Sequence, residues 1–187
     1  MDQFSYLSVL LSIILGLAIT QVLKGFRGIL LGRMRIRLYW PVLVWSIGLL
    51  AICVQSWWAM FDLRDVTRWT FAEFSVVLLQ TVFAYMLAAL VLPDFFGSET
   101  VDLRAHYFAH ARWFFGVFIA MLLASLAKDL VLNGHLPDPV NVAFHLAFIA
   151  TSLVAILTRR EWYHKALSLV GIITFAAYTI LLFSRLR

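Results

Sequence analysis

The sequence predicts an all-α, polytopic integral membrane protein folded as a six-transmembrane-helix bundle, and three observations carry this prediction. The 187-residue chain is 63% hydrophobic and 13% charged, with a mean hydropathy of +0.92, whereas about a quarter of the residues in soluble domains are charged. Its apolar residues form six separated stretches, each about as long as the 20 residues that a helix needs to cross a bilayer. Within each stretch the apolar residues are nearly continuous, whereas the strands of a membrane barrel alternate between polar and apolar residues.

The first three stretches are expected to cross the membrane near residues 4–23, 39–61 and 71–92. The chain opens with Met1-Asp2-Gln3 and lacks the basic start of a secretory signal peptide, so we expect the first stretch to remain as a helix. Pro41 and Pro93 fall at the ends of the next two stretches, where the missing backbone donor of proline is tolerated.

The last three stretches are expected near residues 113–132, 140–158 and 166–183. Pro137 and Pro139 precede the fifth stretch and support its boundary. Because six spans leave little chain for a soluble domain, residues 1–187 are predicted to form a single transmembrane domain. A proline precedes both the second and the fifth spans, but no further match supports an inverted repeat of two three-helix halves, and the question of a repeat stays open.

Lysine and arginine are distributed unevenly between the two sides of the predicted bundle. One side holds ten of the 15, namely Lys24, Arg27, Arg33, Arg35, Arg37, Arg104, Arg112, Arg159, Arg160 and Lys165. The positive-inside rule places the richer side in the cytoplasm. We therefore expect a multi-pass protein of a bacterial inner membrane with both termini on the outer side.

The net charge of +5 does not indicate nucleic-acid binding, because the basic residues flank membrane segments and do not form a folded basic face. Anionic lipid headgroups are the expected partners, and each basic residue near them contributes about 1 kcal/mol. The connection between the first two spans holds the main candidates, Lys24, Arg27, Arg33, Arg35 and Arg37. A specific phosphate or lipid substrate is the alternative. Cys53 is the only cysteine, which excludes intramolecular disulfides and zinc sites built from cysteine.

The first span carries small residues at every fourth position, namely Ser8, Ser12, Gly16 and Thr20. Such a stripe allows close approach of two helix backbones, which is how membrane helices associate when lipid removes the hydrophobic driving force. We expect it to pack against another helix, either within the bundle or in a homo-oligomer, for which a dimer is the commonest symmetric choice.

Several polar residues share a depth in the half of the bundle predicted to face outward. They are Gln55, Glu73, Gln80, Asn141 and His145. Polar groups at membrane depth are costly unless they face the protein interior, a partner or water, so their common depth predicts a polar pocket for binding or transport. Structural pairing is the alternative, in particular for Glu73, which has Arg64 and Arg68 nearby in sequence.

A second cluster precedes the fourth span on the predicted cytoplasmic side. Asp102, His106 and His110 recur every four residues and share one face if the stretch is helical. Two histidines at this spacing can chelate a divalent metal, with the carboxylate as a third ligand. The same pattern also fits an amphipathic segment at the membrane surface, so no cofactor is firmly implied.

The motifs of several membrane enzymes are missing, including a glycine-flanked serine within a span, paired intramembrane histidines for haem, and the His-Glu-x-x-His zinc motif. We therefore favour a small transporter, channel or solute-binding membrane module over an enzyme. One alternative is an accessory or assembly subunit of a larger membrane complex. Another is a membrane enzyme that acts at the cytoplasmic surface through Asp102, Arg104, His106 and His110.

Overall fold

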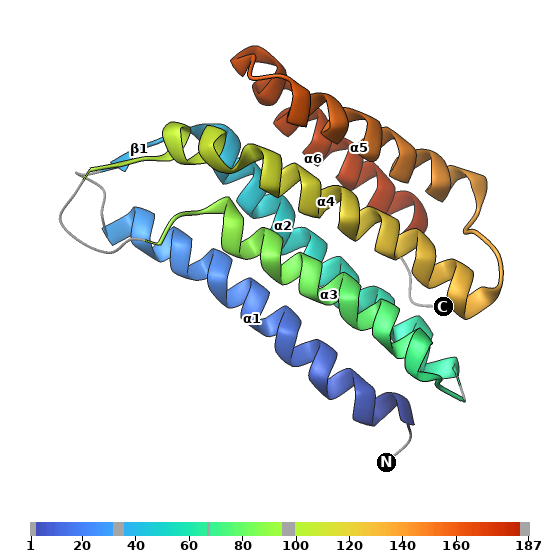
Figure 1. The fold of residues 1–187 in the computed structure, drawn as a ribbon. Coiled ribbons are helices and arrows are strands. Elements are labelled where there is room, and N and C mark those ends of the chain that lie inside the picture. The colour runs from blue at the N-terminus through green and yellow to red at the C-terminus, as the bar shows by residue number, and fades with distance from the viewer. Residues whose placement is uncertain (1–2, 32–35, 67, 95–99, 184–187) are drawn as a thin grey trace.

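The computed structural model describes residues 3–31, 36–66, 68–94 and 100–183, and these residues confirm the predicted six-helix bundle (Figure 1). The helices are α1 (Gln3–Leu31), α2 (Trp40–Ala59), α3 (Phe71–Val91), α4 (Leu103–Asn133), α5 (Pro139–Leu157) and α6 (Glu161–Phe183). A 3-10 turn, η2 (Met60–Asp65), continues α2. All six helices are long and apolar enough to cross a membrane, so the chain is built as a multi-pass membrane protein.

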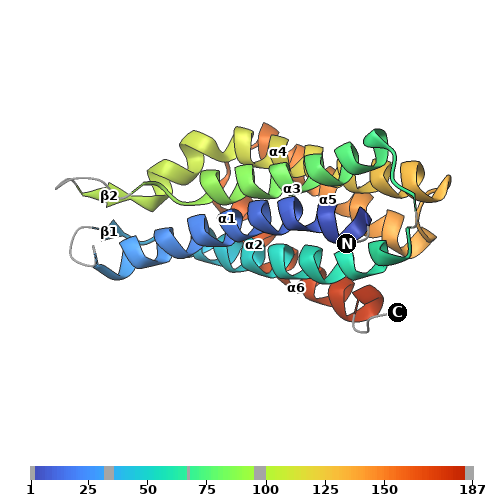
Figure 2. The same cartoon turned by 90° about the horizontal axis from the view of Figure 1, so that it is seen from below.

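The helices run in alternating directions, so that α1 begins and α6 ends at the same end of the bundle, called here the terminal end (Figure 1). In the front layer α1 packs on α3, α3 on α4, and α4 on α5. Behind this row α2 and α6 pack on each other (Figure 2). This two-layer arrangement places the interior of the bundle between α2 and α6 on one side and α3, α4 and α5 on the other.

Two short strands lie at the opposite end, called here the strand end. β1 (Ile36–Arg37) pairs in parallel with β2 (Val101–Asp102), with Ile36 opposite Val101. The pairing joins the α1–α2 connection to the α3–α4 connection. The sequence does not predict it, because two residues are too few to show the alternation that identifies a strand.

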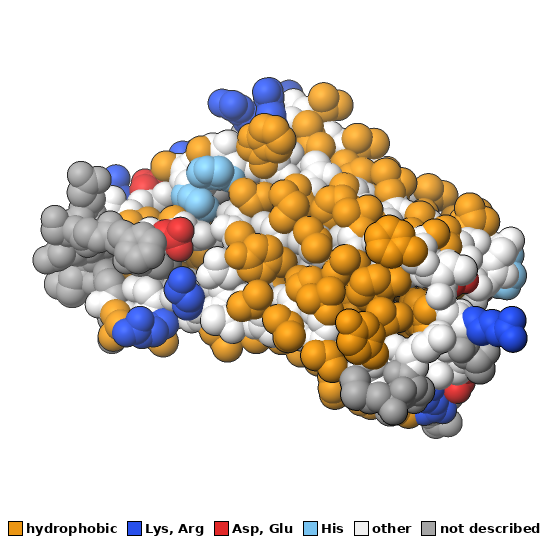
Figure 3. All heavy atoms as spheres, turned by 60° about the horizontal axis from the view of Figure 1, so that its bottom comes forward, with side chains coloured by type: hydrophobic (Ala, Val, Ile, Leu, Met, Phe, Trp, Pro, Cys, Tyr) orange, Lys and Arg blue, Asp and Glu red, His pale blue; other side chains and the backbone are white. Residues whose placement is uncertain are grey.

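The surface of the bundle matches a membrane environment. On the face drawn in Figure 3, hydrophobic side chains form a broad band across the middle, and charged side chains lie toward the two ends. Large apolar side chains such as Ile47, Leu153 and Ile173 are exposed on the helices. In lipid these side chains keep apolar surroundings without being buried in protein.

Three helices extend well beyond the predicted spans. α1 continues to Leu31, α4 begins at Leu103, well before Trp113, and α6 begins at Glu161, before Ala166. Asp102 starts α4 by accepting hydrogen bonds from the backbone N–H groups of Arg104 and Ala105. Hydropathy detects only the apolar part of a helix, whereas backbone hydrogen bonding continues through polar turns as long as the end is capped.

The small-residue stripe of α1 faces away from the bundle. The buried face of this helix consists instead of Leu11, Leu15, Ala18, Val22 and Gly25. Ser12, Gly16 and Thr20 are exposed, Ser8 is half-buried, and a Cβ added at Gly16 would meet no atom within 4 Å. The stripe therefore does not pack α1 into its own bundle, and packing between protomers stays a prediction.

Candidate functional site

A cavity of about 70 Å³ lies inside the bundle between α2, α3, α4, α5 and α6. Its polar lining residues are Gln55, Ser56, Gln80, Ser125, His145, Ser168 and Tyr178. Its aromatic lining residues are Trp45, Phe118, Phe144, Phe148 and Phe175. The cavity therefore combines apolar walls with a few polar groups, which is typical of small-molecule sites.

Three of the polar residues singled out from the sequence meet at this cavity. Gln55 comes from α2, Gln80 from α3 and His145 from α5, and all three line it. Asn141 lies next to it, because its Oδ1 accepts a 3.4 Å hydrogen bond from the hydroxyl of Tyr178, which is itself a lining residue. Residues that the sequence places only at a common depth are thus brought together by the packing of separate helices.

Glu73 does not line the cavity. It lies in the first turn of α3, where its Oε2 accepts a 2.6 Å hydrogen bond from the backbone N–H of Thr70. The Thr70 hydroxyl in return accepts a hydrogen bond of 3.2 Å from the backbone N–H of Glu73. This reciprocal arrangement is a capping box, for which the Thr-x-x-Glu spacing is the sequence signal.

The polar lining groups differ in how their hydrogen bonds are satisfied. The Nδ1 of His145 lies 2.9 Å from the Asn141 carbonyl oxygen and must donate, since a carbonyl oxygen only accepts. In the neutral ring this leaves Nε2 as an acceptor. Within the described part of the chain, the side-chain amides of Gln55 and Gln80 make no hydrogen bond to protein. Each amide therefore has donors and an acceptor left for a bound molecule or water.

Sequence reasoning missed the contribution of α6. Ser168, Gly171, Phe175 and Tyr178 all line the cavity. They recur at intervals of three or four residues, which places them on one face of a helix. That spacing is the signal that could have identified this wall of the site.

Lys128 and Asp129, near the end of α4, are not among the lining residues of the cavity. Their side chains form an ion pair of 3.8 Å with each other, and each is about one-fifth exposed. The two opposite charges of this pair therefore offset each other, and neither side chain lines the cavity.

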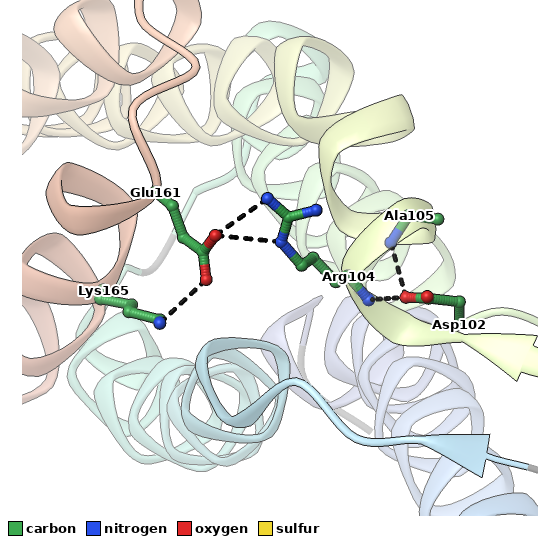
Figure 4. Close-up of polar contacts among 5 residues, drawn as sticks. All are labelled: Asp102, Arg104, Ala105, Glu161 and Lys165. Atoms are coloured by element: carbon green, nitrogen blue, oxygen red, sulfur yellow. Dashed lines mark hydrogen bonds and ion pairs between the residues drawn. The ribbon is translucent and has the colours of Figure 1, made fainter.

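At the strand end, the polar residues are engaged with one another (Figure 4). The guanidinium of Arg104 contacts the Glu161 carboxylate through two nitrogens, at 3.0 and 2.9 Å. Lys165 reaches the other oxygen of Glu161 at 2.8 Å. Because Asp102 caps α4 at the same place, these side chains connect the start of α4 to the start of α6.

The arrangement of the two histidines gives no support to a metal site. His106 Nε2 donates to the Leu90 carbonyl oxygen at 3.1 Å, and His110 Nδ1 donates to the His106 carbonyl oxygen at 2.9 Å. Their rings lie 4.5 Å apart, but the Asp102 carboxylate is used in the helix cap. Among the described residues, no three His, Cys, Asp or Glu side chains form a group that could hold a metal ion.

Tyr39 is a buried tyrosine in the connection beside this cluster. Burial, with a smaller contribution from the Glu161 carboxylate, raises the pKa of Tyr39 to about 12. The Tyr39 ring packs on Tyr107 and Phe108, with centroids 5.6 and 6.1 Å away. Tyr39 therefore acts as a neutral packing residue at neutral pH.

The basic residues expected to bind lipid headgroups lie near the strand end where the structure describes them. Lys24 and Arg27 are exposed on α1. Arg37 is exposed and lies 3.9 Å from Asp102, while Arg33 and Arg35 lie outside the described residues. These exposed positions are compatible with binding to lipid headgroups, which stays a prediction.

No protein-family model, curated protein or solved structure matches this chain. What the protein does is therefore inferred from the residues of the cavity and their hydrogen-bonding state. The cavity is the strongest candidate site, because it gathers polar groups from several helices within the apolar part of the bundle.

Proposed function

We propose that this protein is a solute-binding membrane protein of the transporter or channel class, and that its ligand occupies the cavity between the two layers of the bundle. The supporting observation is that Gln55 and Gln80 line the cavity with amides that make no hydrogen bond to the described residues. An amide without a partner in an apolar environment costs about 2 kcal/mol or more. A ligand or water that satisfies these groups would offset that cost.

The lining residues define the chemistry of the ligand. None of the cavity's lining residues is a Lys, Arg, Asp or Glu. A charged ligand would lose its hydration without gaining a counter-charge, which is unfavourable. Two amides and an imidazole instead suit an uncharged group that both donates and accepts hydrogen bonds.

We infer that the protein lies in a bacterial inner membrane with its strand end in the cytoplasm. The exposed cations Lys24, Arg27, Arg159 and Arg160 gather at this end, in keeping with the positive-inside rule. The termini would then lie on the outer side. Gln55, one turn before the end of α2, would place the cavity in the outer half of the membrane.

The test is native mass spectrometry of the protein released from lipid nanodiscs. We expect the wild-type protein to carry a small organic molecule at fixed stoichiometry and the Gln55→Leu, Gln80→Leu double variant to lack it. Gln21→Leu is the matched control, because it replaces a glutamine by a leucine on α1, away from the cavity. Identical spectra for all three proteins would contradict the proposal. Flux of the identified molecule into proteoliposomes then separates transport from binding.

A second proposal is that the protein is an accessory subunit or forms a homodimer. It is supported by the outward position of Ser12, Gly16 and Thr20 on α1. We expect Gly16→Leu to weaken such an assembly, since a large side chain prevents close approach of a second helix. The copy number in the same mass spectra measures this, and an unchanged copy number in Gly16→Leu would exclude the stripe as the interface.

A further inference from the structure

A groove on the membrane-facing side of the bundle runs between α2 and α6. It has a volume of about 660 Å³, and its walls include Val54, Trp58, Ala176 and Ile180. Val54 and Ile180 are more than half exposed, at 57% and 68%. The groove is therefore open to whatever surrounds the helices, which in a bilayer is lipid.

The groove and the interior cavity share part of their lining. Gln55, Ile172 and Phe175 belong to both. Of these three residues, only Gln55 has a polar side chain. The boundary between the two spaces is therefore formed by two apolar side chains and one amide that has no hydrogen bond to the described residues.

The packing of α2 on α6 explains why the two spaces meet here. The helices come close at two glycines, because a Cβ on Gly48 would lie 3.4 Å from Ile172 and a Cβ on Gly171 would lie 3.5 Å from the Trp45 ring. The groove continues from this contact toward the terminal end, where Trp58 and Ile180 line it. Thr179, the other small polar residue of the groove, donates its hydroxyl to the Phe175 carbonyl on its own helix at 3.0 Å. Gln55 is thus the polar group left for a ligand at this boundary.

We propose that the ligand enters the cavity sideways from the bilayer, passing between α2 and α6 at this shared boundary, and that it is a single-chain lipid with a small uncharged headgroup. A long-chain alcohol or primary amide has this chemistry. Its chain lies in the groove, and its head reaches the cavity and hydrogen-bonds Gln55 and Gln80. This inference rests on the proposed function and specifies the substrate class of the same site.

Size and charge separate this class from other lipids. The cavity, at about 70 Å³, admits a headgroup of only a few heavy atoms, whereas the groove, at about 660 Å³, is far larger. Phospholipids carry charged headgroups, and no lining residue of either space is charged. Moving an alkyl chain from lipid into an apolar groove changes its surroundings little. Selectivity therefore comes from the hydrogen bonds to the head.

The experiment uses a hexadecanol probe that carries a photoreactive diazirine and an alkyne tag, with the full chain in nanodiscs. We expect light to attach the probe to peptides of α2 and α6 in the wild-type protein. Gln80→Leu should lower this labelling by about tenfold, since it removes hydrogen bonds to the head. Ala176→Trp, which fills the groove, should lower it similarly.

Ala177→Trp is the matched control for the groove. Ala177 is the next residue on α6, is exposed, and does not line the groove, so the same substitution should leave labelling unchanged. Ala51→Trp blocks the groove from α2 and serves as an independent variant if Ala176→Trp does not fold. If labelling persists in both Ala176→Trp and Ala51→Trp, the proposed entry between α2 and α6 is wrong.

A butanol probe with the same reactive group distinguishes this inference from the proposed function. If butanol labels the cavity in a Gln80-dependent manner and hexadecanol does not, the lipid inference is wrong and the binding function stands. If labelling by both probes is the same in wild-type protein and in Gln80→Leu, both are wrong. Loss of hexadecanol labelling in Gln80→Leu and in the blocked variants supports both.

Discussion

The imidazole of His164 and the hydroxyl of Tyr107 form a 2.9 Å hydrogen bond that joins α6 to α4 inside the bundle. His164 is fully buried, and its Nε2 lies 3.0 Å from the Thr158 carbonyl oxygen. Because a carbonyl oxygen only accepts, Nε2 carries the proton, and Nδ1 of the neutral ring accepts the hydrogen bond from Tyr107. In this tautomer the His164 side chain thus connects α6 to α4 and to the turn between α5 and α6.

Tyr107→Phe is expected to destabilise the protein. The substitution keeps the ring that packs 5.2 Å from Phe108 but leaves the buried Nδ1 of His164 without its donor. An unsatisfied buried group costs about 1–3 kcal/mol. Unfolding by increasing SDS mole fraction, followed by circular dichroism, measures the free energy of unfolding.

Tyr6→Phe is the matched control for that measurement. Tyr6 is 71% exposed on α1, so the same loss of a hydroxyl should change stability by less than about 0.5 kcal/mol. Equal stabilities of the Tyr107→Phe and Tyr6→Phe variants would mean that the His164 contact contributes nothing to folding.

Alanine substitutions at two glycines of α1 should have opposite effects. A Cβ at Gly25 would lie 2.8 Å from the Cβ of Leu92 and closer still to the end of that side chain. Gly25→Ala should therefore push α1 away from this contact and destabilise the bundle by about 1–3 kcal/mol. A Cβ at Gly16 would meet nothing within 4 Å, so Gly16→Ala should be neutral or stabilise by up to about 1 kcal/mol through better helix propensity. The same SDS titration compares the two variants, and destabilisation of similar size at both sites would contradict the packing of α1.

Gln80→Leu should make the ligand-free protein as stable as the wild type or more stable. The change removes an amide that has no hydrogen bond to the described residues and replaces it with an apolar side chain of similar size. The expected gain is up to about 2 kcal/mol in the free energy of unfolding. A loss of more than about 1 kcal/mol, measured on protein stripped of bound lipid, would show that the amide has a structural partner.

The fold follows from the sequence more directly than the site does. Hydropathy identifies six spans because each helix must present apolar side chains to lipid over its whole length. The depth of Gln55, Gln80 and His145 is also visible in the sequence, since depth depends only on the distance from a helix end. Which of these side chains meet depends on how helices rotate and pack, and no local pattern contains that information.

Two groups of residues show what competes with a functional interpretation of polar residues. Glu73 lies at a helix end, where the capping box with Thr70 uses its carboxylate. His164 and Glu161, whose side-chain types also suggest metal binding, form hydrogen bonds to Tyr107 and Arg104. The need to satisfy helix ends and buried polar groups thus accounts for several residues whose types alone suggest chemistry.

Cysteine labelling tests the orientation on which the outward position of the cavity depends. Cys53 is fully buried, so the wild-type protein should resist a membrane-impermeant maleimide and provide a low background. Ala105→Cys places a thiol at the strand end, and Asn133→Cys places one at the terminal end. Both residues are exposed and uncharged, so the substitutions leave the distribution of charge between the two ends unchanged.

We expect Asn133→Cys to react in intact cells and Ala105→Cys to react only after the membrane is permeabilised. The reason is that the exposed basic residues gather at the strand end, and lysine and arginine are retained on the cytoplasmic side. The opposite pattern would place both termini in the cytoplasm. The cavity would then lie in the inner half of the membrane, and a lipid entering between α2 and α6 would have to come from the inner leaflet, because Gln55 lies one turn from the terminal end of α2.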